Sequence, residues 1–320
     1  MIYRLFNNNK PIVQIILPLL GVLLWMPSIY NNKGVQFIQT YGLFEFLDKV
    51  PIMTGQFISI VIIISTAIIL SYTINKSELF SKNQYLPALL YIMIVSSDND
   101  FHVLNPIIVG NLMLSLAVLA LFNVYRQVPC KNLIFKSSCL VLLATIFYFP
   151  FIVFFLLPWL VLSIIRPFEP KEWLMPIVGL AVIVFYLILI HTISPSFFDF
   201  KFSFKEMQGN RIELSLMLKL IYGLLIIGCF SSLLILLKLN AKSTNRFRKL
   251  SLILLAVFLL FIALAIYSNY YLNLTSLVLL AGIPISLLLP LTLVHSKKKW
   301  LSELFLSAVF ILILFDLYFI

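Results

Sequence analysis

Long apolar runs separated by short polar stretches dominate the chain and predict helices that cross a membrane. A helix needs about 20 mainly apolar residues to span the hydrocarbon core of a bilayer. Runs of this length occur at 11–30, 52–74, 104–124, 173–192, 214–237, 249–268, 272–294 and 300–319. The pattern therefore predicts an all-α protein, folded as a polytopic transmembrane helical bundle.

Two further apolar regions do not fit a single span each. The run at 85–97 is short, and a polar stretch separates it from the next run. The run at 137–165 is too long for one crossing and is interrupted by prolines, so we expect a hairpin of two helices over 137–149 and 151–165. With these three added, the prediction is about 11 membrane segments.

Composition supports this class and excludes others. The chain is 62% hydrophobic and only 11% charged, with a mean hydropathy of +1.07. Because soluble domains are about 25% charged, a soluble enzyme, a secreted disulfide-rich domain and a nucleic-acid-binding module are all excluded as descriptions of the whole chain. The formal net charge of +11 then needs another explanation than a nucleic-acid partner.

The placement of lysine and arginine explains that charge. With the N-terminus in the cytosol and alternating spans, 17 of the 23 basic residues fall in cytosolic connections. Such connections carry an excess of lysine and arginine in membrane proteins. The first apolar run lacks a small-residue cleavage site and is expected to be retained as a span. The sequence therefore predicts a multi-pass membrane protein with its N-terminus inside and its C-terminus outside.

No linker separates domains, so residues 1–320 are expected to form a single integral membrane domain with no soluble domain. The outer connections are predicted at about 31–51, 96–103 and 193–213. Most acidic residues fall in these connections, which makes the outer face the place to look for a polar site.

The first outer connection offers two candidate catalytic carboxylates, Glu45 and Asp48. The stretch GLFEFLDKV is typical of a short amphipathic helix, in which Glu45, Asp48 and Lys49 share one face. One hypothesis makes one of these acids a general base at the membrane surface. The other is an interfacial helix with a solvated polar face.

The second outer connection places Asp98, Asp100 and His102 within five positions. Two carboxylates and an imidazole could hold a divalent cation at Asp98 and Asp100, or supply a base. The alternative is a turn whose Asp and Asn side chains cap the following helix. No other metal site or cofactor is predicted, since the three cysteines form no Cys/His cluster.

The third outer connection combines aromatic and basic residues. Phenylalanine alternates with other residues over 198–204, which favours an extended segment with one aromatic face. Lys201, Lys205 and Arg211 lie in the same connection, and His191 begins it. Cations that bind phosphate, beside rings that contact an alkyl chain, suit a lipid-linked phosphate. The alternative is an aromatic belt at the membrane interface.

Few charges lie inside the predicted spans. Lys219, Glu303 and Asp316 lie near span ends, from which their side chains can reach the interface. This scarcity argues against an ion-coupled pump, because charges inside a membrane usually mark an ion path. The cytosolic stretch 166–173 contains two prolines and is expected to be a rigid structural turn.

The layout resembles that of the C-type membrane glycosyltransferases, which have about eleven spans, a cytosolic N-terminus and an acidic first outer loop. The stretches YLPALLYIMIVSSDND and IIRPFEPKEW are also similar to a family of bacterial polytopic inner-membrane proteins with no assigned activity. The first resemblance implies a polyprenyl-phosphate-linked sugar donor and a carboxylate, Glu45 or Asp48, that deprotonates the acceptor or positions a metal. It also implies that basic residues hold the donor phosphate, among them His191, Lys201, Lys205 and Arg211.

Three functional hypotheses follow from these features. The leading one is a glycosyltransferase-like protein at the outer face, with its catalytic carboxylates among Glu45, Asp48, Asp98 and Asp100 and with His102 among the substrate-binding residues. The second is a non-catalytic scaffold or accessory subunit of a cell-envelope complex, and the third is a transporter of lipids or small solutes. The expected partners are membrane lipids, a polyprenyl-phosphate sugar donor and, for the second hypothesis, an envelope protein.

Overall fold

The structure is a computed structural model that describes most of the chain. The described residues are 2–7, 11–31, 50–80, 82–98, 102–126, 129–193, 215–268, 274–296 and 298–319. Within these ranges every regular element is a helix, so the prediction of an all-α protein is confirmed.

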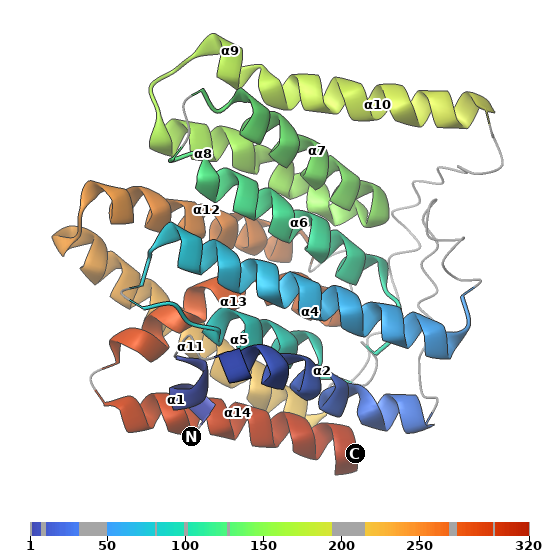
Figure 1. Ribbon diagram of the computed structural model, residues 1–320, viewed down its shortest axis with the longest axis vertical. Coiled ribbons are helices and arrows are strands. Elements are labelled where there is room, and N and C mark those ends of the chain that lie inside the picture. The colour runs from blue at the N-terminus through green and yellow to red at the C-terminus, as the bar shows by residue number, and fades with distance from the viewer. Residues whose placement is uncertain are drawn as a thin grey trace.

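The helices run across the view in Figure 1 and are stacked from α10 at one edge to α1 and α14 at the other. Their bounds are α1 Ile2–Phe6, α2 Pro11–Asn31, α4 Ile52–Ser77, α5 Leu86–Val95, α6 Pro106–Asn123, α7 Lys131–Phe147, the 3-10 helix η3 Phe149–Leu156, α8 Leu157–Ile165, α9 Pro170–Trp173, α10 Met175–Ile193, α11 Leu216–Lys242, α12 Asn245–Ser268, α13 Leu274–His295 and α14 Lys299–Phe319.

Eight spans in the described residues are long and apolar enough to cross a membrane. They correspond to α2, α4, α6, α9 with α10, α11, α12, α13 and α14. These eight match the eight long apolar runs, and they confirm a polytopic helical membrane bundle. The three regions predicted as short or paired segments are helical too: α5 has ten residues, α7 has 17, and η3 continues directly into α8.

The short helix α5 lies in the interior of the bundle, and all ten of its residues are buried. It packs between α4 and α13. On α13 the contact is close at Gly282, where an added Cβ would lie 3.1 Å from Val95 Cγ2 and 3.2 Å from Tyr91 Cε2. Because protein covers α5 on all sides, the helix does not have to match the thickness of the hydrocarbon core.

Helix α10 is the opposite case and lies at the edge of the bundle (Figure 1). It packs against α7, where Gly179 lets the two backbones approach so closely that an added Cβ would lie 3.0 Å from Ser138 Cβ. Only 11% of its span is buried. Most of its apolar surface therefore faces the surroundings, as expected for a helix in contact with lipid.

Several connections meet at one end of the bundle, which we call the basic end. Glu78 caps α4 with a φ of 56°, and its carboxylate accepts from Arg246 Nη1 at 2.7 Å and from Arg126 Nη2 at 2.9 Å. Hydrogen bonding to Arg246, together with the charges of both arginines, lowers the pKa of Glu78. The contacts join the connections after α4, α6 and α11, which the alternation of spans had placed on the same side.

A buried ion pair fixes the proline-rich turn at the same end. Arg166 Nη1 lies 3.3 Å from Glu172 Oε1, and the Glu172 side chain is 1% exposed. The same Oε1 accepts from the backbone N–H of Cys130 at 3.1 Å, which ties the turn to the start of α7. Burial, and then the Glu172 side chain, raise the pKa of the Cys130 thiol to about 12. The stretch 166–173 thus has the structural role expected of it.

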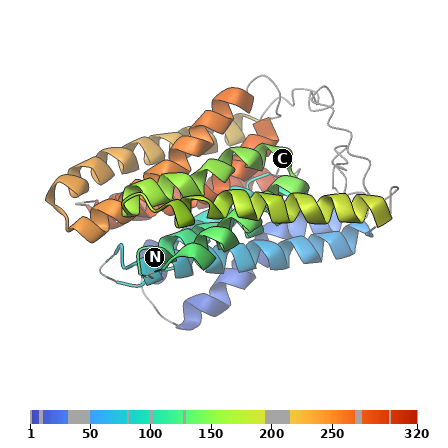
Figure 2. The ribbon, with the colours of Figure 1, turned by 90° about the horizontal axis from the view of Figure 1, so that it is seen from above.

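The connections at the basic end hold most of the lysines and arginines, so the charge asymmetry of the sequence is an asymmetry of the bundle. The N-terminus lies at this end and α14 ends at the opposite one, as Figures 1 and 2 show. At the basic end, Lys249 Nζ on α12 also donates a hydrogen bond to the carbonyl of Ile165, the last residue of α8, at 2.6 Å. Which end faces the cytosol is a prediction from the positive-inside rule.

A glycine contact tests the packing of the η3 segment. An added Cβ at Gly110 on α6 would overlap the ring of Phe151, which is fully buried. We expect Gly110→Ala to lower the free energy of unfolding in detergent by about 1–3 kcal/mol, because overpacking forces buried groups to move. Gly223→Ala on α11 is the matched control, since nothing lies within 4 Å of its added Cβ. If the thermal midpoint of Gly110→Ala equalled or exceeded that of the unchanged protein, the close contact between Gly110 and Phe151 would be contradicted.

Candidate functional site

The end opposite the basic end, which we call the polar end, is organised around the turn that follows α5. Ser96 and Ser97 in this turn are fully buried. Trp25 Nε1 on α2 donates to Ser96 Oγ at 2.9 Å, and Ser97 Oγ lies 3.3 Å from the hydroxyl of Tyr222 on α11. The turn is thereby held between two helices that are far away in the sequence, and it presents the next residue, Asp98, at a defined place.

His102 is part of the same arrangement. Its ring stacks on the Trp25 indole with a centroid distance of 4.5 Å, and its Nδ1 lies 2.9 Å from Ser28 Oγ. The Ser28 hydroxyl donates its one proton to the Trp25 carbonyl at 2.9 Å, so it accepts a hydrogen bond from Nδ1–H. This assigns the tautomer in which Nε2 carries the lone pair.

Burial sets the charge state of His102. The side chain is 0% exposed, and this burial lowers its pKa to about 3, against a small opposing effect of the Ser96 backbone. The imidazole is therefore neutral at physiological pH. In this arrangement it positions the turn after α5 and has no exposed surface with which to contact a substrate.

Two carboxylates lie in segments that α11 contacts, one in the turn after α5 and one on α14. Asp98 is half-buried beside Ser97, while Asp316 on the last turns of α14 is 6% exposed. The Ser215 hydroxyl at the start of α11 donates to Asp316 Oδ1 at 2.8 Å. We call these residues, Asp98, Ser215, Tyr222 and Asp316, the two-carboxylate site.

A cation lies on the same helical face as this site. Ser215, Lys219 and Tyr222 are spaced at i, i+4 and i+7, which places them along one stripe of α11. Lys219 is exposed. The site therefore combines a buried acid, a partly exposed acid, a phenol and a cation at the polar end of the bundle.

The sequence-predicted residues fall into three groups. Asp98 and His102 belong to the polar end as described above. His191 is exposed near the end of α10, at the opposite edge of the bundle from α14, so the structure does not bring it to the two-carboxylate site (Figure 1). The remaining predicted residues lie outside the described part of the chain: Glu45, Asp48, Asp100, Lys201, Lys205 and Arg211.

The structure corrects two interpretations of the sequence. Asp316 does not reach for the interface, because it is buried and hydrogen-bonded to Ser215. The sequence did contain a signal for a role of Asp316, since an acidic residue inside an apolar span is a functional candidate by default. In the described residues the cap of α6 is Asn105, whose Oδ1 accepts from the Ile107 N–H at 2.9 Å, and not Asp98.

The sequence offers Asp98 and Asp100 as ligands of a divalent cation. Among the described residues no group of three His, Cys, Asp or Glu side chains could hold a metal ion, and Asp100 lies outside that set.

The buried neutral imidazole predicts a pH dependence of stability. The pKa of His102 falls from 6.5 in the unfolded chain to about 3 in the folded protein. Below pH 6.5 the unfolded chain therefore binds a proton that the folded protein does not, so the free energy of unfolding decreases as the pH falls from 6.5 towards 3. At pH 4.5 the loss amounts to about 3 kcal/mol. Unfolding in detergent at pH 7.5 and 4.5 should show a smaller difference for His102→Gln than for the unchanged protein. The exposed His191→Gln is the control and should keep the full difference; an equal difference in both variants would contradict a neutral buried ring.

Comparison of the chain with protein-family models, with curated proteins and with solved structures finds no match.

Proposed function

We propose that the protein is a glycosyltransferase-like enzyme that uses a polyprenyl-phosphate-linked sugar at the polar end of the bundle. The observation that carries the proposal is that α11 joins two acid-bearing segments: its Tyr222 hydroxyl lies 3.3 Å from Ser97 Oγ in the turn that carries Asp98, and its Ser215 donates to Asp316 Oδ1 at 2.8 Å.

Asp98 is proposed as the general base. In an inverting transfer, a carboxylate accepts the proton of the acceptor hydroxyl while the hydroxyl oxygen bonds to the sugar and the sugar–phosphate bond breaks. Asp98 is only partly buried and is therefore within reach of an acceptor, whereas Asp316 is buried and holds Ser215. We assign Asp316 to positioning the start of α11.

The leaving phosphate is assigned to basic residues at the start of α11. Lys219 lies on the same helical stripe as Tyr222 and is exposed. Arg211 precedes Ser215 by four residues, a length of chain that reaches about 14 Å at most. Lys201 and Lys205 belong to the same connection. Cations at this position would stabilise the negative charge that develops on the phosphate as the bond breaks.

The proposed location follows from the charge asymmetry. With the basic end in the cytosol, the polar end faces the outside of a bacterial inner membrane, where polyprenyl-linked sugars are used. The C-terminal end of α14, which carries Asp316, then lies on the outer side.

Transfer from a radiolabelled polyprenyl-phosphate sugar by the purified full-length protein tests the proposal. Asp98→Asn should lower kcat at least about 100-fold, because a general base contributes on the order of 10²–10⁴ to the rate. Lys219→Gln should mainly raise KM for the donor. Glu169→Gln, an exposed acid at the basic end, is the matched control and should leave the rate unchanged.

The alternatives give different results in the same variants. Unchanged glycolipids in cells that carry Asp98→Asn would contradict its role as general base, and unchanged glycolipids with Asp316→Asn would contradict its positioning role. If the same variants also co-purified in stoichiometric amounts with an envelope protein, the accessory-subunit hypothesis would replace it. Uptake or lipid flipping by vesicles that contain the protein, without sugar transfer, would favour the transporter hypothesis.

A further inference from the structure

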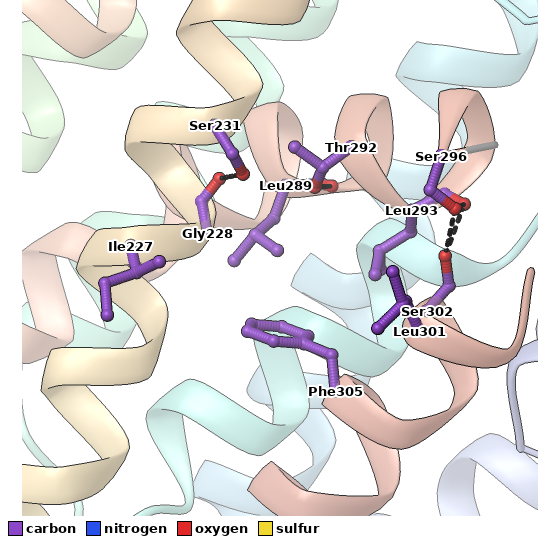
Figure 3. Close-up of a pocket in the computed structure, with 10 residues that line it drawn as sticks. All are labelled: Ile227, Gly228, Ser231, Leu289, Thr292, Leu293, Ser296, Leu301, Ser302 and Phe305. Atoms are coloured by element: carbon purple, nitrogen blue, oxygen red, sulfur yellow. Dashed lines mark hydrogen bonds between the residues drawn. The ribbon is translucent and has the colours of Figure 1, made fainter. Parts of the chain in front are cut away.

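A lateral groove lies between α11, α13 and α14, away from the two-carboxylate site. Figure 3 shows Ile227, Gly228 and Ser231 of α11 on one side, Leu289 and Thr292 of α13 behind, and Phe305 of α14 below. The cavity measures about 170 Å³. Ligand pockets for drug-sized molecules measure about 300–1,000 Å³, so this groove suits a slender ligand.

The hydroxyls that line the groove are already hydrogen-bonded within the protein, so its walls present mainly apolar surface. The Ser231 hydroxyl donates to the Gly228 carbonyl at 2.7 Å, and the Thr292 hydroxyl donates to the Leu289 carbonyl at 2.7 Å. The hydroxyls of Ser296 and Ser302 bond to each other at 2.6 Å. Because protein acceptors take these protons, the groove offers contact surface for an alkyl chain and no unsatisfied donor for a polar head.

The groove is open to the membrane. Its rim residues Ile227 and Leu301 are 67% and 47% exposed. Both belong to membrane-spanning helices, so the exposed side of the groove faces the acyl chains of the bilayer. A lipid chain can enter it sideways without leaving the membrane.

Exposed lysines lie where the groove approaches the basic end. Lys238 follows Ser231 by seven residues, which places it on the same face of α11 about 10 Å further along the helix. Lys298 follows the lining residue Ser296 by two residues in the connection between α13 and α14. The acid of this region, Glu303, lines a different cavity together with Arg4.

From this arrangement we propose that the groove binds one acyl chain of an anionic phospholipid, whose phosphate lies between Lys238 and Lys298. The lipid belongs to the leaflet at the basic end. Basic residues at the membrane surface attract anionic headgroups, and their long side chains reach the headgroup level from a helix end. The site is independent of the proposed glycosyl transfer, which concerns the opposite end of the bundle.

Native mass spectrometry of the full-length protein in detergent tests this site, with phosphatidylglycerol and phosphatidylcholine as probes. The unchanged protein should retain phosphatidylglycerol at lower lipid concentration than phosphatidylcholine. The double variant Lys238→Gln/Lys298→Gln should lose at least about tenfold in affinity for phosphatidylglycerol, and with it the preference, since each lysine near the surface contributes about fivefold. This variant changes no buried contact.

A second variant fills the groove. Ser231→Phe should reduce retention of both lipids, whereas Ile226→Phe, which adds a ring at an exposed position outside the lining, should not. Thermal midpoints in detergent confirm that both variants fold. The proposal is overturned if the unchanged protein retains the two lipids equally, or if Ser231→Phe and Ile226→Phe retain phosphatidylglycerol alike.

Discussion

The bundle is organised around α5, a ten-residue helix that is too short to cross the hydrocarbon core and has no exposed residue. Such a helix exists only where other helices cover all of its faces, so α4 and α13 must pack closely on it. Gly282 provides the close approach on the α13 side. The end of α5 then lies inside the protein, and the polar turn that follows it must find its hydrogen-bond partners within the bundle.

The partners of that turn define the polar end. Ser96 bonds to Trp25, Ser97 contacts Tyr222, and His102 stacks on Trp25. These are neutral groups, and they hold in place the turn that carries Asp98. The two-carboxylate site is thus a consequence of satisfying buried backbone and side-chain groups at the end of a short helix.

The two ends of the bundle use different chemistry. At the basic end, connections are joined by ion pairs such as that between Arg166 and Glu172, and by Glu78 with its two arginines. At the polar end they are joined by hydroxyl, indole and imidazole contacts. This division places the proposed sugar transfer and the proposed phospholipid groove at opposite membrane surfaces, so that a lipid bound at one end does not compete with a substrate at the other.

The sequence alone was sufficient to predict the helical class and the eight long spans, because hydropathy over about 20 residues is a local property. It also predicted which connections lie at the same end of the bundle, because the positions of Lys and Arg can be read directly from the sequence. The break in the apolar run at 137–165 was also predicted from its prolines, since Pro150 and Pro158 lie in the first turns of η3 and α8. The sequence pointed to Asp98 and His102 but not to the residues that contact them from other helices. Asp316 and Ser215 are 101 residues apart, and His102 and Ser28 are 74 apart. Whether Asp316 reaches water or turns inward, and whether His102 is exposed or neutral and buried, depends on which helices pack together, and only the tertiary structure decides that.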